Sequence, residues 1–435
     1  MKDVDAGKTN RFSALIRRFI MIGSSYGGTF AALLLVCMMS YASQADSPVT
    51  ANEQETKASA PKIGPSFLTA DGTELLLDGK PFRAVGVNKY DLAMQFLSGG
   101  SERDKAAQAI QEAAEHGFRV IRFLASGFYP RHMHLWSDYD AYWGRMDDLV
   151  KTARDAGVWL IPTIMWNHYL FPDMARESVQ DMLTNKDSRS RQYLELYTHQ
   201  LVTRYKDEPT ILFWGLTNEL NLNADLESVR PYGFSALNAI NDGSAIIRVR
   251  RDNYTTEQMI PFMRDMAQFI RERDPNHLIG SGYSSPRPSA QHLRMSPSRG
   301  DWTEDSIEQV ETYIRDTHPD PIDLISIHFY SEHDNFRFGN KDKNCASPLR
   351  KLKEICDRVG KPVYIGETGA IFEEPDAMKF MNSVFDEALA VDYPIILMWV
   401  WKCPGREHNI EPDSTPDIIK LMQTAGDKLQ KQAEK

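Results

Sequence analysis

Ile211-Leu-Phe-Trp-Gly-Leu-Thr-Asn-Glu219 is the stretch of sequence from which the fold can be read. Its first six residues are typical of a buried strand, and a carboxylate follows them closely. Val363-Tyr-Ile-Gly-Glu367 ends in the same way. An ionised carboxylate that leaves water must find partners, so placing one at the end of a buried strand is costly. We therefore expect both glutamates to have a chemical function.

Outward from these two strands the chain repeats one pattern. From Arg83 onward, short apolar runs alternate with longer amphipathic stretches, which is typical of repeated βα units on a parallel sheet. The runs cover residues 84–88, 120–124, 159–165, 211–216, 277–282, 324–328, 363–366 and 395–399. Eight strands with intervening helices predict an α/β fold, a closed (β/α)8 TIM barrel.

The stretches between these runs predict the helices of the barrel. Gly117, Gly157 and Gly360 each end such a stretch just before a strand, where glycine most easily adopts the left-handed conformation that terminates a helix. The predicted helices cover residues 105–116, 147–156, 191–205, 256–273, 306–317, 348–359 and 375–390.

Around the barrel the chain divides into further segments. Residues 46–64 are polar with little apolar content and predict a flexible linker. Short runs separated by Asp-Gly pairs between residues 67 and 82 predict a small antiparallel hairpin. We expect the catalytic domain to span residues 65–425 and a polar tail to span 426–435. Long insertions at 221–255 and 284–303 overhang the predicted active face, and loops of this length usually have a function.

The N-terminal 45 residues resemble a targeting segment. Arg11, Arg17 and Arg18 precede an uncharged stretch, residues 19–45, whose most apolar part, 30–39, is short for a membrane span. The small residues Ser43 and Ala45 offer a cleavage site before Asp46. The pattern predicts a signal peptide and a secreted or periplasmic protein. The alternative is an uncleaved signal that anchors the protein to the membrane.

Charge and cysteine content narrow the class of protein. The net charge is −10, with Lys and Arg scattered along the chain, which argues against a nucleic-acid-binding surface. Cleavage of the signal would leave Cys345, Cys356 and Cys403, without metal-ligand spacing. Cys345 could pair with either of the others, or all three could be free thiols. The oligomeric state stays open.

Polar and aromatic side chains gather where the predicted strands end. The carboxyl ends of barrel strands form one face, and chemistry takes place there. The residues at these ends are Asn88, Tyr90, Arg122, Trp166, Asn167, His168, Asn218, Glu219, His328, Tyr330, Glu367, Trp399 and Trp401.

Two carboxyl groups on one barrel face are what the cleavage of a glycosidic bond requires. One protonates the departing oxygen, and the other attacks the sugar or activates water. The fourth and seventh strands lie on opposite sides of an eight-stranded barrel, so Glu219 and Glu367 can face each other across its mouth. A separation of about 5–5.5 Å, typical of retaining enzymes, is then reachable.

Several motifs resemble those of one enzyme family. Phe213-Trp-Gly-Leu-Thr-Asn-Glu219, Ile325-Ser-Ile-His-Phe-Tyr330 and Lys361-Pro-Val-Tyr-Ile-Gly-Glu367 are similar to the motifs of strands four, six and seven in glycoside hydrolase family 5, a family of retaining (β/α)8 glycosidases. Leu77-Asp-Gly-Lys-Pro-Phe-Arg-Ala-Val-Gly-Val-Asn88 resembles the start of its β-mannanase branch. The similarity extends in order over residues 67–405.

This resemblance implies roles for particular residues. Glu219 would be the acid/base and Glu367 the nucleophile, with Asn218 bonded to the 2-hydroxyl of the sugar. Arg122 would hold Glu367 ionised, and Tyr330 would donate to the same carboxylate. Because Glu219 must start protonated, we expect the negative charge of Glu367 to favour that form, and the pair to titrate as a unit.

Other site residues have more than one interpretation. His328 could orient the acid/base or bind sugar, or it could only support its neighbours. Trp399 and Trp401 lie on one face of the last strand, where the family has a tryptophan under the sugar; one would stack on the substrate and the other would be core. Trp166, Asn167 and His168 are candidates for sugar contacts.

The sequence contains no motif for a metal or a cofactor, so we expect none. His132 and His134 lack a third ligand at a fitting spacing. The hypothesis is therefore a retaining glycoside hydrolase that cleaves β-linked polysaccharide, and the resemblance to the β-mannanase branch favours β-1,4-mannan as the substrate. The alternatives are a β-1,4-glucanase, an exo-β-mannosidase or a transglycosylase, and, outside the enzymes, a carbohydrate-binding barrel.

Overall fold

The computed structural model describes residues 62–227, 233–330, 338 and 346–434. The chain forms two units, Met1–Ala58 and Ser59–Lys435, and every described residue belongs to the second. The predicted signal or anchor, and all but the last three residues of the predicted linker, therefore lie outside the described residues. Among the helices that are described, none is both long and apolar enough to cross a membrane.

A small antiparallel sheet opens the described chain, as the Asp-Gly pairs predict. It consists of β1 (Thr69–Asp71), β2 (Glu74–Leu77) and β3 (Lys80–Pro81). Leu75 on β2 is fully buried, together with Phe82 and the first residues of the barrel strands, including Ala84 and Val120. The sheet thus covers the amino-terminal end of the barrel with apolar side chains.

The predicted parallel barrel is confirmed. Its strands are β4 (Ala84–Asn88), β5 (Val120–Leu124), β6 (Trp159–Met165), β7 (Phe213–Thr217), β10 (Leu278–Gly280), β11 (Ile325–Phe329), β12 (Val363–Thr368) and β13 (Ile395–Met398). In the described part of the chain their order is β10-β7-β6-β5-β4-β13-β12-β11, and every neighbouring pair is parallel. A parallel bridge between Gly280 and Leu324 joins the two ends of this order and closes the barrel.

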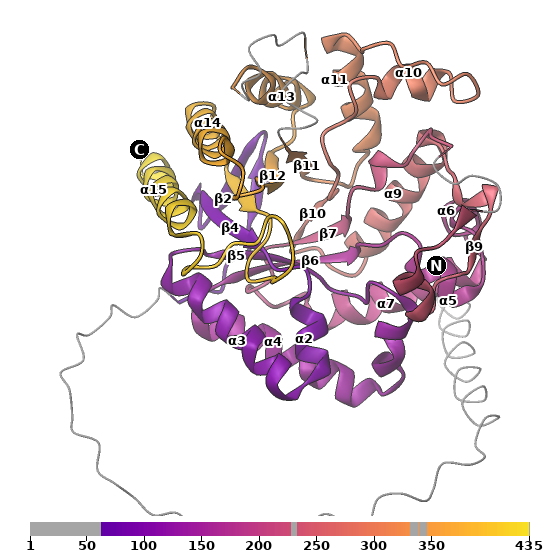
Figure 1. Cartoon of the computed structure of the whole chain (residues 1–435), viewed down its shortest axis with the longest axis horizontal. Coiled ribbons are helices and arrows are strands. Elements are labelled where there is room, and N and C mark those ends of the chain that lie inside the picture. Colours follow the sequence, from indigo (N-terminus) through magenta and orange to yellow (C-terminus); the bar gives the residue numbers. More distant parts are fainter. Residues whose placement is uncertain (1–61, 228–232, 331–337, 339–345, 435) are drawn as a thin grey trace, which may run out of the picture. The chain divides into compact units, whose positions relative to one another are not determined.

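Helices surround the strands (Figure 1). They are α2 (Leu92–Ser98), α3 (Gly100–Glu115), α4 (Tyr139–Ala156), α5 (Leu170–Ala175), α6 (Val179–Thr184), α7 (Arg189–Tyr205), α9 (Thr256–Arg271), α11 (Ile307–Thr317), α13 (Ala346–Val359), α14 (Ala377–Ala390) and α15 (Pro416–Ala433). Helix α4 ends at Gly157 in the left-handed region, with φ of 70°, as expected for a glycine stop.

The chain end differs from the polar tail expected at residues 426–435. Helix α15 continues to Ala433, and its Leu429 side chain is fully buried. The residues on the outer face of this amphipathic helix are polar, so the sequence resembles a tail. About one buried residue per turn is nevertheless enough to hold the helix on the barrel.

Both long insertions contain short elements. The first comprises η3 (Leu220–Leu222), β8 (Gly233–Phe234), α8 (Leu237–Asn241), β9 (Ile247–Arg248) and η4 (Arg250–Asp252), and the second contains α10 (Ala290–Met295). Arg248 joins the first insertion to α5 through two 2.8 Å bonds to Asp173. The Arg131 amide, in η2 (Pro130–Ser137), donates to the Asp242 carbonyl. This insertion therefore lies over the loops that follow β5 and β6.

Two of the three cysteines considered for a disulfide lie in the described part of the chain. Cys356 and Cys403 are both buried and both are free thiols. Cys345, the partner considered for either of them, lies outside the described residues. Burial raises the pKa of the Cys403 thiol, which keeps it protonated and unreactive.

Candidate active site

Glu219 follows β7 in an unusual backbone conformation. Its φ is 51°, in the left-handed region that residues other than glycine seldom adopt. Its amide donates to the Gly282 carbonyl at 2.8 Å. A side chain at Gly282 would collide with the backbone, because a Cβ there would lie 1.7 Å from the Thr217 oxygen. Strain of this kind collects at functional sites, and here it directs a carboxylate into the mouth of the barrel.

Glu367 lies on β12 and is 5% exposed. Arg122 Nη1 donates to its Oε1 at 2.7 Å, and the Tyr330 hydroxyl donates to its Oε2 at 3.1 Å. Burial raises the pKa of Tyr330, and the charges of Glu367 and Glu219 raise it further. Tyr330 therefore stays a phenol and a donor, and Glu367 has a partner on each oxygen, as an ionised carboxylate needs when it is buried.

Arg122 connects the residues of this cluster. Besides Glu367, it donates to Asn88 Oδ1 at 3.0 Å and to Asn218 Oδ1 at 2.7 Å. Its guanidinium also lies 4.3 Å from the centre of the Trp166 ring. The side chain is fully buried. One planar cation thus orients two amides and a carboxylate, a task that suits the rigid fork of arginine.

Asn88 is a site residue to which the sequence assigned no role. Its amide nitrogen donates to the Gly366 carbonyl at 2.9 Å, while its oxygen accepts from Arg122. It therefore links the end of β4 to β12 beside the nucleophile candidate. Its place at the end of a strand is the signal by which such a role could have been found. Trp166, a candidate for sugar contacts, packs against the guanidinium of Arg122.

His328, on β11, faces both carboxylates. Its Nδ1 is 2.9 Å from Glu219 Oε1 and 3.5 Å from Glu367 Oε2. The ring is fully buried, and burial lowers its pKa to about 3, with Glu367 opposing this shift and Arg122 adding to it. The imidazole is therefore neutral at any ordinary working pH.

The two carboxylates meet as the barrel topology requires. One side-chain oxygen or ring nitrogen from each of Glu219, His328 and Glu367 lies within 4.8 Å of the corresponding atoms of the other two residues. In the described residues no other group of histidine and carboxylate side chains has the spacing to hold a metal ion. A cation there would also face the bound guanidinium of Arg122. The spacing instead suits two carboxyl groups acting on a single carbon atom.

Trp399 and Trp401 do not lie on one face of the last strand as expected, because β13 ends at Met398 and both residues follow it. Trp399 stacks on Tyr90 and Trp166, with ring centres 5.7 and 6.0 Å away, so three aromatic rings lie beside the carboxylates. Trp401 instead is fully buried, and its indole nitrogen donates to the Ala109 carbonyl on α3. Trp401 therefore belongs to the core, and Trp399 is left as the candidate for stacking on a sugar.

The side chains of Asn167 and His168 contact neighbouring loop residues and not the carboxylates. Asn167 donates to the Phe128 carbonyl at 2.8 Å and accepts from the Tyr169 amide, so it braces two loops. His168 packs against the rings of Tyr169 and Tyr254, and burial lowers its pKa to about 4. Both side chains lie on the active face, but neither joins the cluster around the carboxylates.

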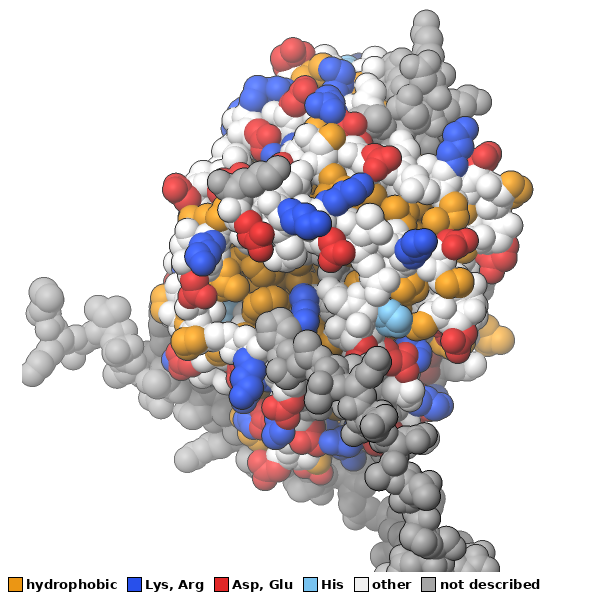
Figure 2. All heavy atoms as spheres, turned by 90° about the vertical axis from the view of Figure 1, so that its left-hand side faces the viewer, with side chains coloured by type: hydrophobic (Ala, Val, Ile, Leu, Met, Phe, Trp, Pro, Cys, Tyr) orange, Lys and Arg blue, Asp and Glu red, His pale blue; other side chains and the backbone are white. Residues whose placement is uncertain are grey.

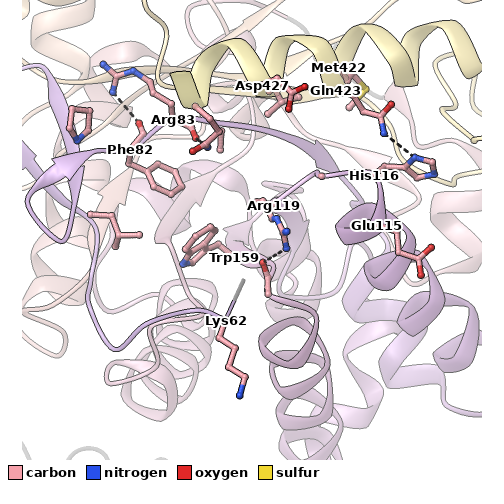
Figure 3. A pocket seen from close by; sticks show the side chains of 18 residues that line it. Lys62, Phe82, Arg83, Glu115, His116, Arg119, Trp159, Met422, Gln423 and Asp427 are labelled. Carbon is pink, nitrogen blue, oxygen red and sulfur yellow. Dashed lines mark hydrogen bonds between the residues drawn. The ribbon is translucent and has the colours of Figure 1, made fainter. Parts of the chain in front are cut away.

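A separate hollow of about 740 Å³ opens at the other end of the barrel (Figure 3). Phe82, Arg119 and Trp159, at the amino-terminal ends of strands, line it together with Met422 and Asp427 of α15. Acidic and basic side chains are interspersed over the face shown in Figure 2. Chemistry in barrels of this kind takes place at the opposite, carboxyl ends of the strands, so this hollow is not the candidate active site.

Comparisons with known proteins agree with this geometry. The family described as "Cellulase (glycosyl hydrolase family 5)" matches residues 77–401. Mannan endo-1,4-beta-mannosidase 8 of Oryza sativa subsp. japonica is 26% identical over 77% of this chain and 87% of its own length. Mannan endo-1,4-beta-mannosidase 3 of Arabidopsis thaliana is 25% identical over 70% of this chain and 71% of its own.

Solved structures share the fold. The endo-1,4-beta-mannanase from Rhizomucor miehei superimposes with a TM-score of 0.59 at 19% identity, over 84% of this chain and all of that one. The endo-beta-1,4-mannanase from Thermotoga petrophila gives a TM-score of 0.57 at 16% identity, over 81% of this chain and 78% of that one.

Proposed function

We infer the function from one premise: the chain belongs to glycosyl hydrolase family 5 and is a glycoside hydrolase that acts on carbohydrate. We propose that it cleaves β-1,4-linked mannan with retention of configuration, through a covalent glycosyl-enzyme. The observation that carries the mechanism is the meeting of Glu219 and Glu367 within 4.8 Å across the barrel mouth.

The first step joins the sugar to the protein. Glu219 gives its proton to the glycosidic oxygen while a carboxylate oxygen of Glu367 attacks the anomeric carbon, so the bond to the leaving sugar breaks as the ester bond forms. Glu219 is suited to this because its side chain is 32% exposed and can reach the leaving group. Glu367 is held by Arg122 and Tyr330.

The second step releases the sugar. Glu219, now ionised, takes a proton from water, and the water oxygen attacks the same carbon and frees Glu367. Two inversions give net retention. A second sugar in place of water would yield a transglycosylation product, so the same site supports that reaction as well.

The choice of mannan depends on the relatives. Several of them are named mannan endo-1,4-beta-mannosidases, over most of the length of this chain. β-1,4-Glucan is the second candidate, because the family description that matches the chain is cellulase. Trp399, with Tyr90 and Trp166 beside it, offers an aromatic surface that would stack on either pyranose.

An oligosaccharide panel tests the proposal. Purified protein is incubated with β-1,4-linked manno-, gluco- and xylo-oligosaccharides of equal length, and products are followed by chromatography and by NMR of the anomeric proton. We expect the manno series to be cleaved fastest, with the β-anomer formed first. Fastest cleavage of the gluco series would reassign the substrate, and an α-anomer formed first would exclude retention.

We also propose that the protein is exported, to the periplasm or out of the cell. The basic residues and short apolar stretch of its first 45 residues support this. Expression of the whole chain in its host, followed by N-terminal sequencing, should find a protein that begins near Asp46. An intact N-terminus in the membrane fraction would favour the anchored alternative.

A further inference from the structure

A layer of hydroxyl groups lies beneath His328 inside the barrel. Ser326 precedes His328 by two residues on β11, so both side chains point to the same side of the strand. Ser326 pairs in register with Tyr364 on β12. A Cβ on Gly366 would lie 2.6 Å from Ser326 Oγ and 3.0 Å from His328 Nε2, so these two atoms flank the same glycine.

These atoms are buried without an assigned partner. Ser326 Oγ, His328 Nε2 and Tyr364 Oη are all inaccessible to solvent, and within the described structure none of the three has a partner in good hydrogen-bonding geometry. Burial raises the pKa of Tyr364, and the charge of Arg122 and the approach of the Ser326 hydroxyl oppose that shift, so Tyr364 stays a phenol. Three polar atoms buried together need one another or a shared water to balance the loss of bulk solvent.

The charges around His328 determine which ring nitrogen carries the proton. The charged and titratable groups that face it are Glu219 after β7, Glu367 and Tyr364 on β12, and Arg122 on β5. Nδ1 faces two carboxyl groups, and a lone pair there would repel the ionised one. The proton therefore belongs on Nδ1, and Nε2 becomes an acceptor that needs a donor.

We propose that Ser326 and Tyr364 are positioning residues that donate to His328 Nε2, directly or across one bound water, and thereby keep the imidazole proton on Nδ1 opposite Glu219 and Glu367. The Nδ1 proton stabilises the ionised form of Glu219, which the second step of the reaction uses as a base. This catalytic consequence depends on the proposed function; the position of the proton does not.

The test combines a spectrum with a pH profile. Ser326→Ala and Tyr364→Phe each remove one hydroxyl, and the double variant removes both. Ring-nitrogen NMR of ¹⁵N-histidine-labelled protein, with the His328 signals assigned by their loss in His328→Gln, reports the tautomer. We expect the Nδ1–H form in the parent protein and a shift toward Nε2–H in the variants. In kcat/KM, the basic limb should move to higher pH by roughly half to one unit, because protonated Glu219 gains an acceptor.

Thr163→Val is the matched control. Thr163 Oγ1 is another buried barrel hydroxyl without a hydrogen bond in the described structure, but it lies beside Gly215 on the β6–β7 side of the barrel. This control should change neither the tautomer nor the basic limb. An unchanged tautomer in the double variant, or an equal change in Thr163→Val, would overturn the proposal. The NMR result can be read even if mannan proves not to be the substrate, so the two hypotheses fail separately.

Discussion

At the scale of single residues, the two glutamates differ in environment in a way that matches two different tasks. Glu367 is almost fully buried and bonded to Arg122 and Tyr330, whereas a third of the Glu219 side chain is exposed. A group that only attacks carbon benefits from fixed partners. A group that first gives and then takes a proton has to reach both the leaving sugar and water.

This difference predicts how each variant responds to the leaving group. Glu219→Gln should lower kcat on mannooligosaccharides by about 10²–10⁴-fold. On an aryl β-mannoside with a good leaving group its first step should be nearly unaffected, because that group departs without a proton. Stopped-flow release of the phenol would then show a burst. Glu367→Gln should be inactive on both substrates, and equal losses in both variants would contradict the separate roles.

Arg122 leads to a prediction about stability. Arg122→Ala leaves the Glu367 carboxylate buried without its cation, so the free energy of unfolding should fall by about 3–5 kcal/mol. Arg122→Lys keeps a charge but cannot bridge Asn88, Asn218 and Glu367 together, and should lose about 1–3 kcal/mol. Urea unfolding of both variants measures this. A lysine variant as stable and active as the parent would show that the fork geometry is unimportant.

At the scale of elements, a buried ion pair is one of the contacts that hold the first insertion on the barrel. Arg248 on β9 is 12% exposed and Asp173 on α5 is 2% exposed, and the guanidinium lies 3.9 Å from the centre of the Tyr169 ring. The pair is bidentate and partly desolvated, which is the geometry in which an ion pair contributes most. This insertion should therefore detach as a unit when the pair is broken.

Limited proteolysis can measure that detachment. Arg248→Ala should increase cleavage within residues 233–255 by at least tenfold, because the loss of one partner leaves the Asp173 carboxylate buried without its cation. Arg250→Ala is the control, since its ion pair with Glu227 is more than three-quarters exposed and should contribute little. Similar cleavage rates in the two variants would show that other contacts hold the insertion.

The sequence predicted the elements unevenly, for physical reasons. Strands such as β5 and β7 were located because short apolar runs that alternate with amphipathic helical stretches are typical of the buried strands of a parallel sheet. Short helices such as α5 and α6 were missed, because six residues carry too little periodicity to be recognised. Helix α15 was not predicted, and its last residues were expected to be a tail, because its outer face is polar. The orientation of Trp399 and Trp401 depends on how the chain leaves β13, which periodicity does not report.

At the scale of the whole molecule, the barrel brings together residues that are distant in the sequence. Glu219 and Glu367 could be paired in advance because strands four and seven of a closed barrel face each other. The contacts of Asn88 and the hydroxyl layer under His328 could not be predicted from the sequence, because they depend on which side chains turn inward at each level of the barrel. The order of the strands in the barrel predicts which strand ends lie near each other, whereas the packing of the inward-facing side chains determines which atoms are in contact.

Burial of histidines in this barrel also makes its stability depend on pH. Burial lowers the pKa of His168 and His318 to about 4 and that of His328 to about 3. An unfolded histidine has a pKa of about 6.5. Between about pH 6.5 and 4 the unfolded chain therefore binds more protons than the folded one at these positions, so the free energy of unfolding must fall as the pH is lowered through this range.

His318 allows this to be measured away from the active site. It is held by the Ile314 carbonyl at 2.8 Å and the Ser281 hydroxyl at 3.0 Å, behind the barrel wall. His318→Gln removes one titrating group, so the slope of unfolding free energy against pH below about 6 should decrease by up to about 1.4 kcal/mol per pH unit. Urea unfolding at several pH values gives both slopes. Parallel curves for the variant and the parent would mean that His318 is protonated in the folded protein, because only then would its removal leave the slope unchanged.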